Sequence, residues 1–247
     1  MALAMEVVSL GGPCPQRLTP GGACAWRLPE DERGPALARR LLHQTMDGLG
    51  LGRDVIEDGK LAVSEIATNA LQHGGPPPEL WVWARTVPAP QLVVSVFDGA
   101  RKALPQPSNG DLLDDHGKGL GLVGEFTAGW GCDLTRSRVA EPAVSGKAVW
   151  FALPIPRVRP GRELRVHPAT AAQCLLLCIT RRGFPGMRTS DVHGVSVLVL
   201  PGLNVWVHPQ HFCWQDGPDR YLRRPLIDLQ ETAEHIVRQL DAIPVRK

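Results

Sequence analysis

VSEIATNALQHGG, residues 63–75, is the second half of a predicted helix that runs from about Asp54 to His73. An apolar stripe at helical spacing marks one buried side, formed by Ile56, Val63, Ile66, Ala67 and Ala70. Gly74, Gly75 and the prolines at 76–78 end the helix, because proline lacks the backbone donor and glycine favours a helix stop.

Glu65 and Asn69 are four residues apart on this helix, so they lie one turn apart on a side other than the apolar one. A carboxylate that takes a proton beside an amide oxygen that binds a hard cation suits magnesium-dependent phosphoryl transfer. The alternative is that both side chains simply face water, and for an isolated pair of this kind that is the better interpretation.

The segments around this helix predict an α+β fold. A helix over Glu32–Met46 precedes it, and strands with a period of two follow at 80–85 and 92–98. A polar loop at 99–116, a short helix at 120–126 and further strands complete the unit, the strands at 129–135 and 147–154. This order predicts a two-layer α/β sandwich, with helices on one face of a mostly antiparallel sheet.

Two further motifs carry chemistry. Asp98 ends a strand, where its carboxylate can accept a hydrogen bond from an exocyclic amine such as that of adenine; the alternative is a simple Asp-Gly turn with Gly99. A glycine-rich run precedes the short helix and suits backbone contacts with phosphate, or else forms a hinge. It consists of Gly117, Lys118, Gly119, Leu120, Gly121 and Leu122, and it matches neither a Walker loop nor a Rossmann fingerprint.

In this order and spacing, the three motifs and the closing strand KAVWFAL (147–153) resemble a known family. The stretch from about Trp26 to Pro154 is similar to the anti-sigma-factor-like serine/threonine kinases of actinobacterial type, within the gyrase, Hsp90, histidine-kinase and MutL (GHKL) ATPase superfamily. The resemblance implies a Bergerat fold that binds ATP and Mg²⁺. It implies that Asn69 holds magnesium with the ATP phosphates, that Glu65 is the catalytic general base, that Asp98 binds the adenine amine, and that residues 117–122 line the triphosphate.

The sequence departs from the family pattern at two positions. Ala100 stands where many superfamily members have a second glycine, and Ala148 replaces a frequent threonine near the expected adenine. Both changes predict weak ATP binding. The sequence also has no histidine-bearing dimerisation helix before the domain, which argues against a sensor histidine kinase.

Four parts are predicted along the chain: a flexible arm at 1–25, the ATP-binding domain at 26–156, a Pro- and Arg-rich linker at 157–165, and a small α/β unit at 166–247. Residues 1–156 contain 14 basic and 17 acidic side chains, a balance of −3, whereas the remainder contains 13 and 8, a balance of +5. The last unit is predicted to contain a helix at 168–182, a hairpin at 195–209 and a helix at 228–243.

The composition is that of a globular protein, with 43% hydrophobic residues and a net charge of only +2. Six scattered cysteines are interpreted as reduced thiols in the cytoplasm, and we expect no secretory signal, membrane span or direct nucleic-acid binding. His208, His211 and Cys213 suggest zinc only weakly, because cysteines in apolar segments are usually part of the core.

The resulting hypothesis is an ATP-dependent serine protein kinase that binds a sigma factor or phosphorylates an anti-sigma-factor antagonist. Both partners come from the resemblance alone, and the oligomeric state, including a homodimer, is left open. One alternative is an ATP-gated binding module without transfer activity, and another is a fold that has lost ATP.

Overall fold

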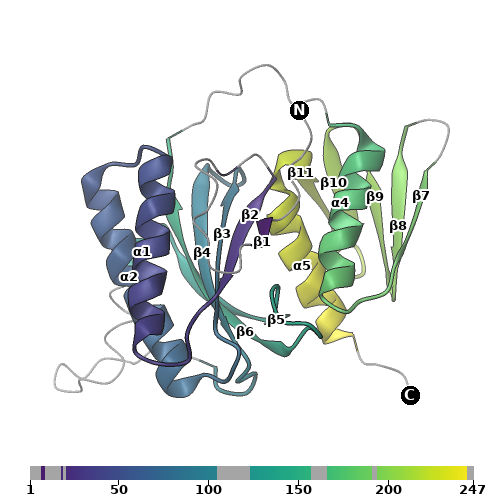
Figure 1. Cartoon of the computed structure of the whole chain (residues 1–247). Helices are drawn as coiled ribbons and strands as arrows, with labels where there is room; N and C mark the ends of the chain where they lie inside the picture. The colour runs from purple at the N-terminus through teal and green to yellow at the C-terminus, as the bar shows by residue number, and fades with distance from the viewer. Residues whose placement is uncertain are drawn as a thin grey trace.

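The computed structural model describes residues 7–8, 18, 21–104, 123–156, 166–190 and 194–243. Figure 1 shows a helical pair, a first sheet, a second helical pair and a second sheet, in that order across the molecule. The predicted α+β class is confirmed: a two-layer α/β sandwich is joined to a small C-terminal α/β unit.

The first sheet has the strand order β1-β2-β3-β4-β6-β5 and is antiparallel except for the β1–β2 pair. Its strands are β1 (Val7–Val8), β2 (Ala23–Arg27), β3 (Glu79–Arg85), β4 (Gln91–Asp98), β5 (Trp130–Arg136) and β6 (Ser145–Pro154). The four expected strands, two of them predicted from a period of two, are present. The strand β2, with no such pattern, begins at Ala23, inside the stretch predicted to be an arm.

Helices α1 (Arg33–Gly48) and α2 (Arg53–His73) cover one face of this sheet, as predicted. Leu42 and Met46 of α1 and Ile66 of α2 are fully buried against the sheet residues Leu80 and Val94. Burying a side chain of this size contributes about 1.5–3 kcal/mol each, so the apolar stripe of α2 fixes which side of the helix faces away from the sheet.

The C-terminal unit has its own sheet and its own core. Helix α4 (Pro168–Arg181) precedes strands in the antiparallel order β11-β10-β9-β8-β7, and helix α5 (Leu229–Ala242) follows the short helix Leu226–Asp228. The strands are β7 (Met187–Ser190), β8 (Ser196–Leu200), β9 (Leu203–Val207), β10 (His211–Gln215) and β11 (Tyr221–Pro225). The predicted helices and hairpin are present; the strands β7 and β11 were not predicted.

Helix α5 is covered on both sides. Its apolar side, with Ile236 and Val237, packs in the core of the C-terminal unit. Its charged side lies against the second face of the first sheet, where Trp83 Nε1 donates a hydrogen bond of 3.0 Å to Glu231 Oε2. In Figure 1 this helix stands between the two sheets. The two units therefore share a polar interface that is largely buried.

Ion pairs dominate this interface. Glu234 of α5 pairs with both Arg138, in the β5–β6 loop, and Arg182, which follows α4. Glu231 pairs with Arg85 at 3.0 Å. Because an unpaired buried charge is costly, these contacts specify how α5 sits on the sheet.

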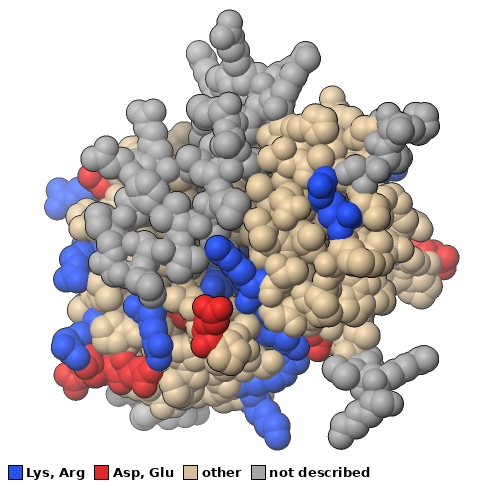
Figure 2. Space-filling model, turned by 45° about the vertical axis from the view of Figure 1, so that its right-hand side comes forward, with Lys and Arg blue, Asp and Glu red and all other residues tan. Residues whose placement is uncertain are grey.

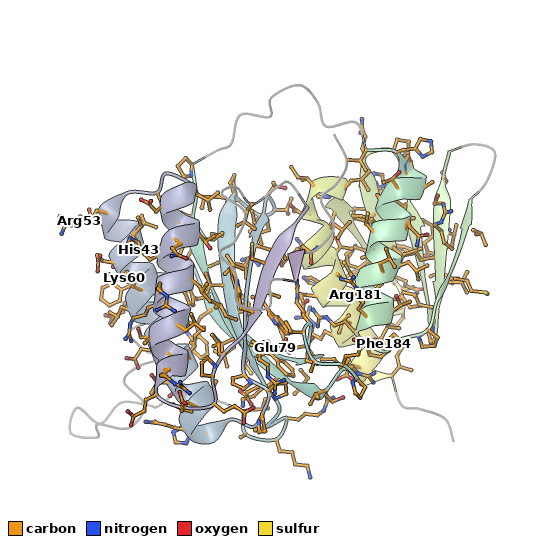
Figure 3. All side chains as sticks on the ribbon, viewed as in Figure 1. His43, Arg53, Lys60, Glu79, Arg181 and Phe184 are labelled. Atoms are coloured by element: carbon orange, nitrogen blue, oxygen red, sulfur yellow. The ribbon has the colours of Figure 1, made fainter. Side chains whose placement is uncertain are left out.

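A fully buried carboxylate positions the loop that carries Arg138. Glu79, labelled in Figure 3 at the base of the first sheet, begins β3. Its oxygens accept hydrogen bonds from Trp81 Nε1 at 2.9 Å and from the backbone N–H groups of Arg138 at 2.8 Å and Ala140 at 3.0 Å. By holding the backbone of this loop, Glu79 positions Arg138 for its ion pair with Glu234 of α5.

The cysteine prediction needs one correction. Cys132, Cys174, Cys178 and Cys213 are not disulfide-bonded, but Cys24 in β2 is. The expectation of reduced thiols throughout is therefore wrong for Cys24, since spacing along the chain does not tell which thiols meet in space.

The outer surface shows no large field of one sign on the face in Figure 2, where acidic and basic side chains mix over the lower part of the view. No helix in the described ranges is long and apolar enough to cross a bilayer. The predicted linker arginines at 157, 159, 162 and 165 lie outside the described residues.

The ion pairs of α5 predict an acid-sensitive interface. Burial alone would raise the pKa of Glu231, but the neighbouring His235 and Arg85 lower it from 4.5 to about 2. The stability that this carboxylate contributes is therefore complete above about pH 4.5 and is lost as the pH falls towards 2. Glu231→Gln should remove roughly 2–3 kcal/mol of this pH dependence, measured by urea unfolding between pH 6 and 2.5. The exposed Glu57→Gln is the control, and a wild-type slope retained in Glu231→Gln would refute the assignment.

Candidate functional site

Helix α2 places Glu65 and Asn69 one turn apart on its polar side, as the spacing predicts. Both side chains are half-buried, while Ile66, Ala67 and Ala70 beside them are buried in the core. Among the described residues, neither Glu65 nor Asn69 has a hydrogen bond or an ion pair with another side chain. Their polar atoms therefore remain available to a ligand.

The end of α2 meets the end of β4, where Asp98 lies. Gly99 N donates a hydrogen bond of 2.6 Å to Gly75 O. A Cβ atom added at Gly74 would lie 2.9 Å from Asp98 Cβ, and one added at Gly99 would lie 2.4 Å from Pro76 O. Both glycines are required by this close approach, which brings the helix of Glu65 and Asn69 against the strand end of Asp98.

Asp98 is engaged in a buried ion pair that the sequence did not reveal. Lys147, its cross-strand neighbour in β6, places Nζ 2.6 and 2.7 Å from the two carboxylate oxygens, and Ala100 N donates to Oδ1 at 2.9 Å. Asp98 is 1% exposed and Lys147 4%. The only sequence signal of this pair was the lysine at the start of the otherwise apolar run KAVWFAL (147–153).

The ion pair leaves the carboxylate limited capacity for a further donor. A carboxylate has about four lone-pair sites, and the donors at Asp98 are the ammonium of Lys147 and one backbone N–H. Among the residues that the structure describes, Oδ2 accepts only from Lys147, so it has a lone pair for one more hydrogen from an amine. The residue type and the donor set fit an adenine amine, provided that the amine shares the carboxylate with Lys147.

The glycine-rich run lies outside the described residues, so Gly117, Lys118, Gly119, Leu120, Gly121 and Leu122 remain predicted phosphate-binding residues. The described chain resumes in a helical turn at residues 123–126, within the predicted short helix. Val123 at its start is buried in the same core as α2.

The turn after Asp98 is tied to the C-terminal unit. Arg101 forms an ion pair with Asp241 near the end of α5, and Asp241 also accepts a bond of 3.1 Å from Arg136 Nε in β5. The turn after Asp98 and helix α5 are therefore linked through the carboxylate of Asp241.

The weak zinc suggestion gains no support within the described ranges, which contain no group of three potential ligands. The rings of His208 and His211 stack with centroids 4.6 Å apart, and burial together with the charge of His208 lowers the pKa of His211. Cys174 and Cys213 are buried.

Comparisons with known proteins do not assign the chain to a family. No family model matches it, and no curated protein matches it. Thirteen solved chains match. One is the histidine kinase domain from Erythrobacter litoralis EL346 blue-light activated histidine kinase, with 23% identity and a TM-score of 0.28. The match covers 49% of this chain and 60%, less than two thirds, of that chain. A likeness at this level identifies no activity.

The buried pair predicts strong coupling between Asp98 and Lys147. Lys147→Met should cost about 3–5 kcal/mol in unfolding free energy, because it leaves a buried carboxylate without its cation. Combining it with Asp98→Asn should cost less than the sum of the two single changes, by about 1–3 kcal/mol. Urea unfolding of the four proteins measures this coupling.

The exposed pair Glu57–Lys60, at 3.0 Å on α2, is the matched control and should show coupling below about 1 kcal/mol. Additive costs for Asp98→Asn and Lys147→Met would mean that the two side chains do not form the pair.

Proposed function

We propose that the chain is an ATP-binding regulatory protein that acts as a serine protein kinase and anti-sigma factor, phosphorylating an anti-sigma-factor antagonist. The observation that carries the proposal is the convergence at the end of α2. Glu65 and Asn69, which bond to no other side chain among the described residues, lie on the helix whose end contacts the buried Asp98. The order of the same residues carries the family resemblance.

Each residue has a distinct role in this proposal. Asn69 would hold Mg²⁺ through its amide oxygen, and Asp98 would accept a hydrogen bond from the adenine amine through Oδ2. The ammonium of Lys147, whose Nζ lies 2.7 Å from that oxygen, would share the carboxylate with the adenine amine. The backbone of residues 117–122 would surround the phosphates.

Bound ATP would supply the phosphoryl group that is transferred. Glu65 would remove the proton from the hydroxyl of a substrate serine, so that its oxygen can form the new bond to the γ-phosphorus. The bond from that phosphorus to the bridging oxygen would break, and ADP would leave. Glu65 is half-buried and has no competing ion pair among the described residues, so it can act as a base.

The identity of the partners rests on the sequence resemblance alone. A sigma factor or an anti-sigma-factor antagonist is the expected partner, and the serine to be phosphorylated belongs to the antagonist. A cytoplasmic location follows from the same assignment.

A second candidate is an ATP-gated binding module without transfer. The Arg101–Asp241 ion pair favours it, because this contact joins the turn after Asp98 to α5. Nucleotide at Asp98 would then alter the C-terminal unit without any chemical step.

Glu65→Gln separates the two candidates. A general base contributes about 10²–10⁴ to the rate and little to ground-state binding. The variant should therefore bind Mg²⁺–ATP as the wild type does and lose transfer by that factor, whereas Asn69→Ala should lose magnesium-dependent affinity. Calorimetry measures binding, and transfer of radioactive phosphate to a co-purifying protein measures activity.

Glu57→Gln, on the exposed side of the same helix, controls for a general effect of removing a carboxylate. A wild type that binds Mg²⁺–ATP and transfers no phosphate would establish the gated module instead. A wild type that does not bind ATP would overturn the whole site assignment.

A further inference from the structure

A cavity of about 220 Å³ lies at the interface between the first sheet and the C-terminal unit, away from the α2 side of the sheet. Trp83 and Trp150 line it from the sheet. Arg224, His235 and Arg238 line it from β11 and α5. Ala148, which the sequence placed near the expected adenine, instead lines this cavity on the face of the sheet opposite α2, so that expectation is wrong. None of Glu65, Asn69 and Asp98 lines the cavity.

The two indole rings are held in place by carboxylates. Trp83 Nε1 donates to Glu231 Oε2 at 3.0 Å, and Trp150 Nε1 donates to Asp133 Oδ2 at 2.9 Å. Val93 of β4 also lines the cavity. The polar edges of the indoles are therefore satisfied. The guanidinium of Arg138 lies over the Trp83 ring, 5.1 Å from its centroid, and that of Arg85 lies over the Trp150 ring at 5.4 Å. Each ring keeps its other face as a flat apolar wall.

The acidic side chains that line the cavity already have cationic partners. Glu231 pairs with Arg85 at 3.0 Å, and Asp133 accepts a bond of 2.7 Å from Arg238. Glu234 pairs with two arginines, Arg138 and Arg182. These carboxylates are therefore largely neutralised.

Arg224, in contrast, lacks good acceptors. Its buried Nε has no hydrogen-bond partner in the described part of the chain, and NH1 reaches only Val87 O, at 3.4 Å. The carboxylate oxygen Glu231 Oε1 is 3.9 Å from NH2, beyond hydrogen-bond distance. The guanidinium of Arg224 is thus a cation at the cavity with N–H groups that lack a good acceptor.

His235 cannot satisfy both arginines beside it. Its Nε2 is 3.0 Å from Arg224 NH2, and its Nδ1 is 3.0 Å from Arg238 NH2. Guanidinium groups only donate, and a neutral imidazole has one acceptor nitrogen. At most one of these contacts is a hydrogen bond, which leaves the other amino group without an acceptor at the ring.

We propose that this cavity binds a small organic anion, a carboxylate carried on a flat apolar body. The carboxylate of the ligand accepts a hydrogen bond from Arg224. It also accepts one from whichever amino group, Arg224 NH2 or Arg238 NH2, does not donate to His235. The apolar part of the ligand lies against Trp83 and Trp150. The volume, below the roughly 300–1,000 Å³ of drug-sized ligand pockets, restricts the ligand to about the size of benzoate.

The cavity is formed by both units, so the ligand stabilises their docked arrangement and acts as an effector of the interface. This proposal does not rest on ATP binding, since the lining residues lie on the other face of the sheet and on the C-terminal unit.

Titration of the full chain with sodium benzoate tests the proposal, with neutral benzamide as the ligand of matched shape. Tryptophan fluorescence and calorimetry should both show saturable benzoate binding, with benzamide at least about tenfold weaker, because a charged hydrogen bond is lost. Arg224→Gln should lower benzoate affinity by a similar factor. Arg220→Gln, an exposed arginine near the same strand, should leave it unchanged.

Absence of saturable benzoate binding, equal affinity for benzamide, or unchanged affinity in Arg224→Gln would each overturn the proposal. If Arg224→Gln does not fold, Arg224→Lys provides the test. It keeps the cation without the planar donor set, so it should still prefer benzoate to benzamide with reduced affinity. Equal affinity of Arg224→Lys for the two ligands would also overturn the proposal.

Discussion

The charged side of helix α5 lies buried between two sheets, and the structure depends on satisfying its carboxylates there. Glu231, Glu234 and Asp241 are each paired with arginines from the first sheet, its loops or the end of α4. Removing one partner from a buried pair costs about 3–5 kcal/mol. That cost specifies a single docking geometry for the two units. Glu79 contributes indirectly, since it holds the loop that presents Arg138.

This interface connects the two ligand sites that we propose. The turn after Asp98 contacts α5 through the Arg101–Asp241 ion pair. The cavity proposed for an organic anion is lined by Arg224 and by His235 of α5, which contact each other. Two ligands that stabilise the same docked arrangement affect each other's affinity reciprocally. If both proposed sites are occupied, the C-terminal unit would couple the small organic anion to the nucleotide at the α2 face of the first sheet.

Much of the first unit could be predicted from the sequence, because its long helices and the strands at 80–85 and 92–98 have clear periods. The stripe that includes Val63 and Ile66 also placed Glu65 and Asn69 correctly on the polar side of α2. The Asp98–Lys147 pair could not be predicted, since it depends on which strands become neighbours. The burial of the charged side of α5 could not be predicted either. One apolar stripe on a helix does not show whether the opposite side faces water or a second sheet. The short strand β2 lacks alternation and was missed for that reason.

Hydrogen–deuterium exchange of the full chain, with and without saturating Mg²⁺–ATP, tests most directly the claim that nucleotide at the α2–β4 junction acts on α5. We expect slower exchange at residues 69–75 and 98–101, together with a change at residues 238–242 of α5, which Arg101 contacts through Asp241. Unchanged exchange at residues 98–101 would contradict the placement of ATP at Asp98. Protection there without any change in α5 would contradict the coupling between the nucleotide site and the C-terminal unit.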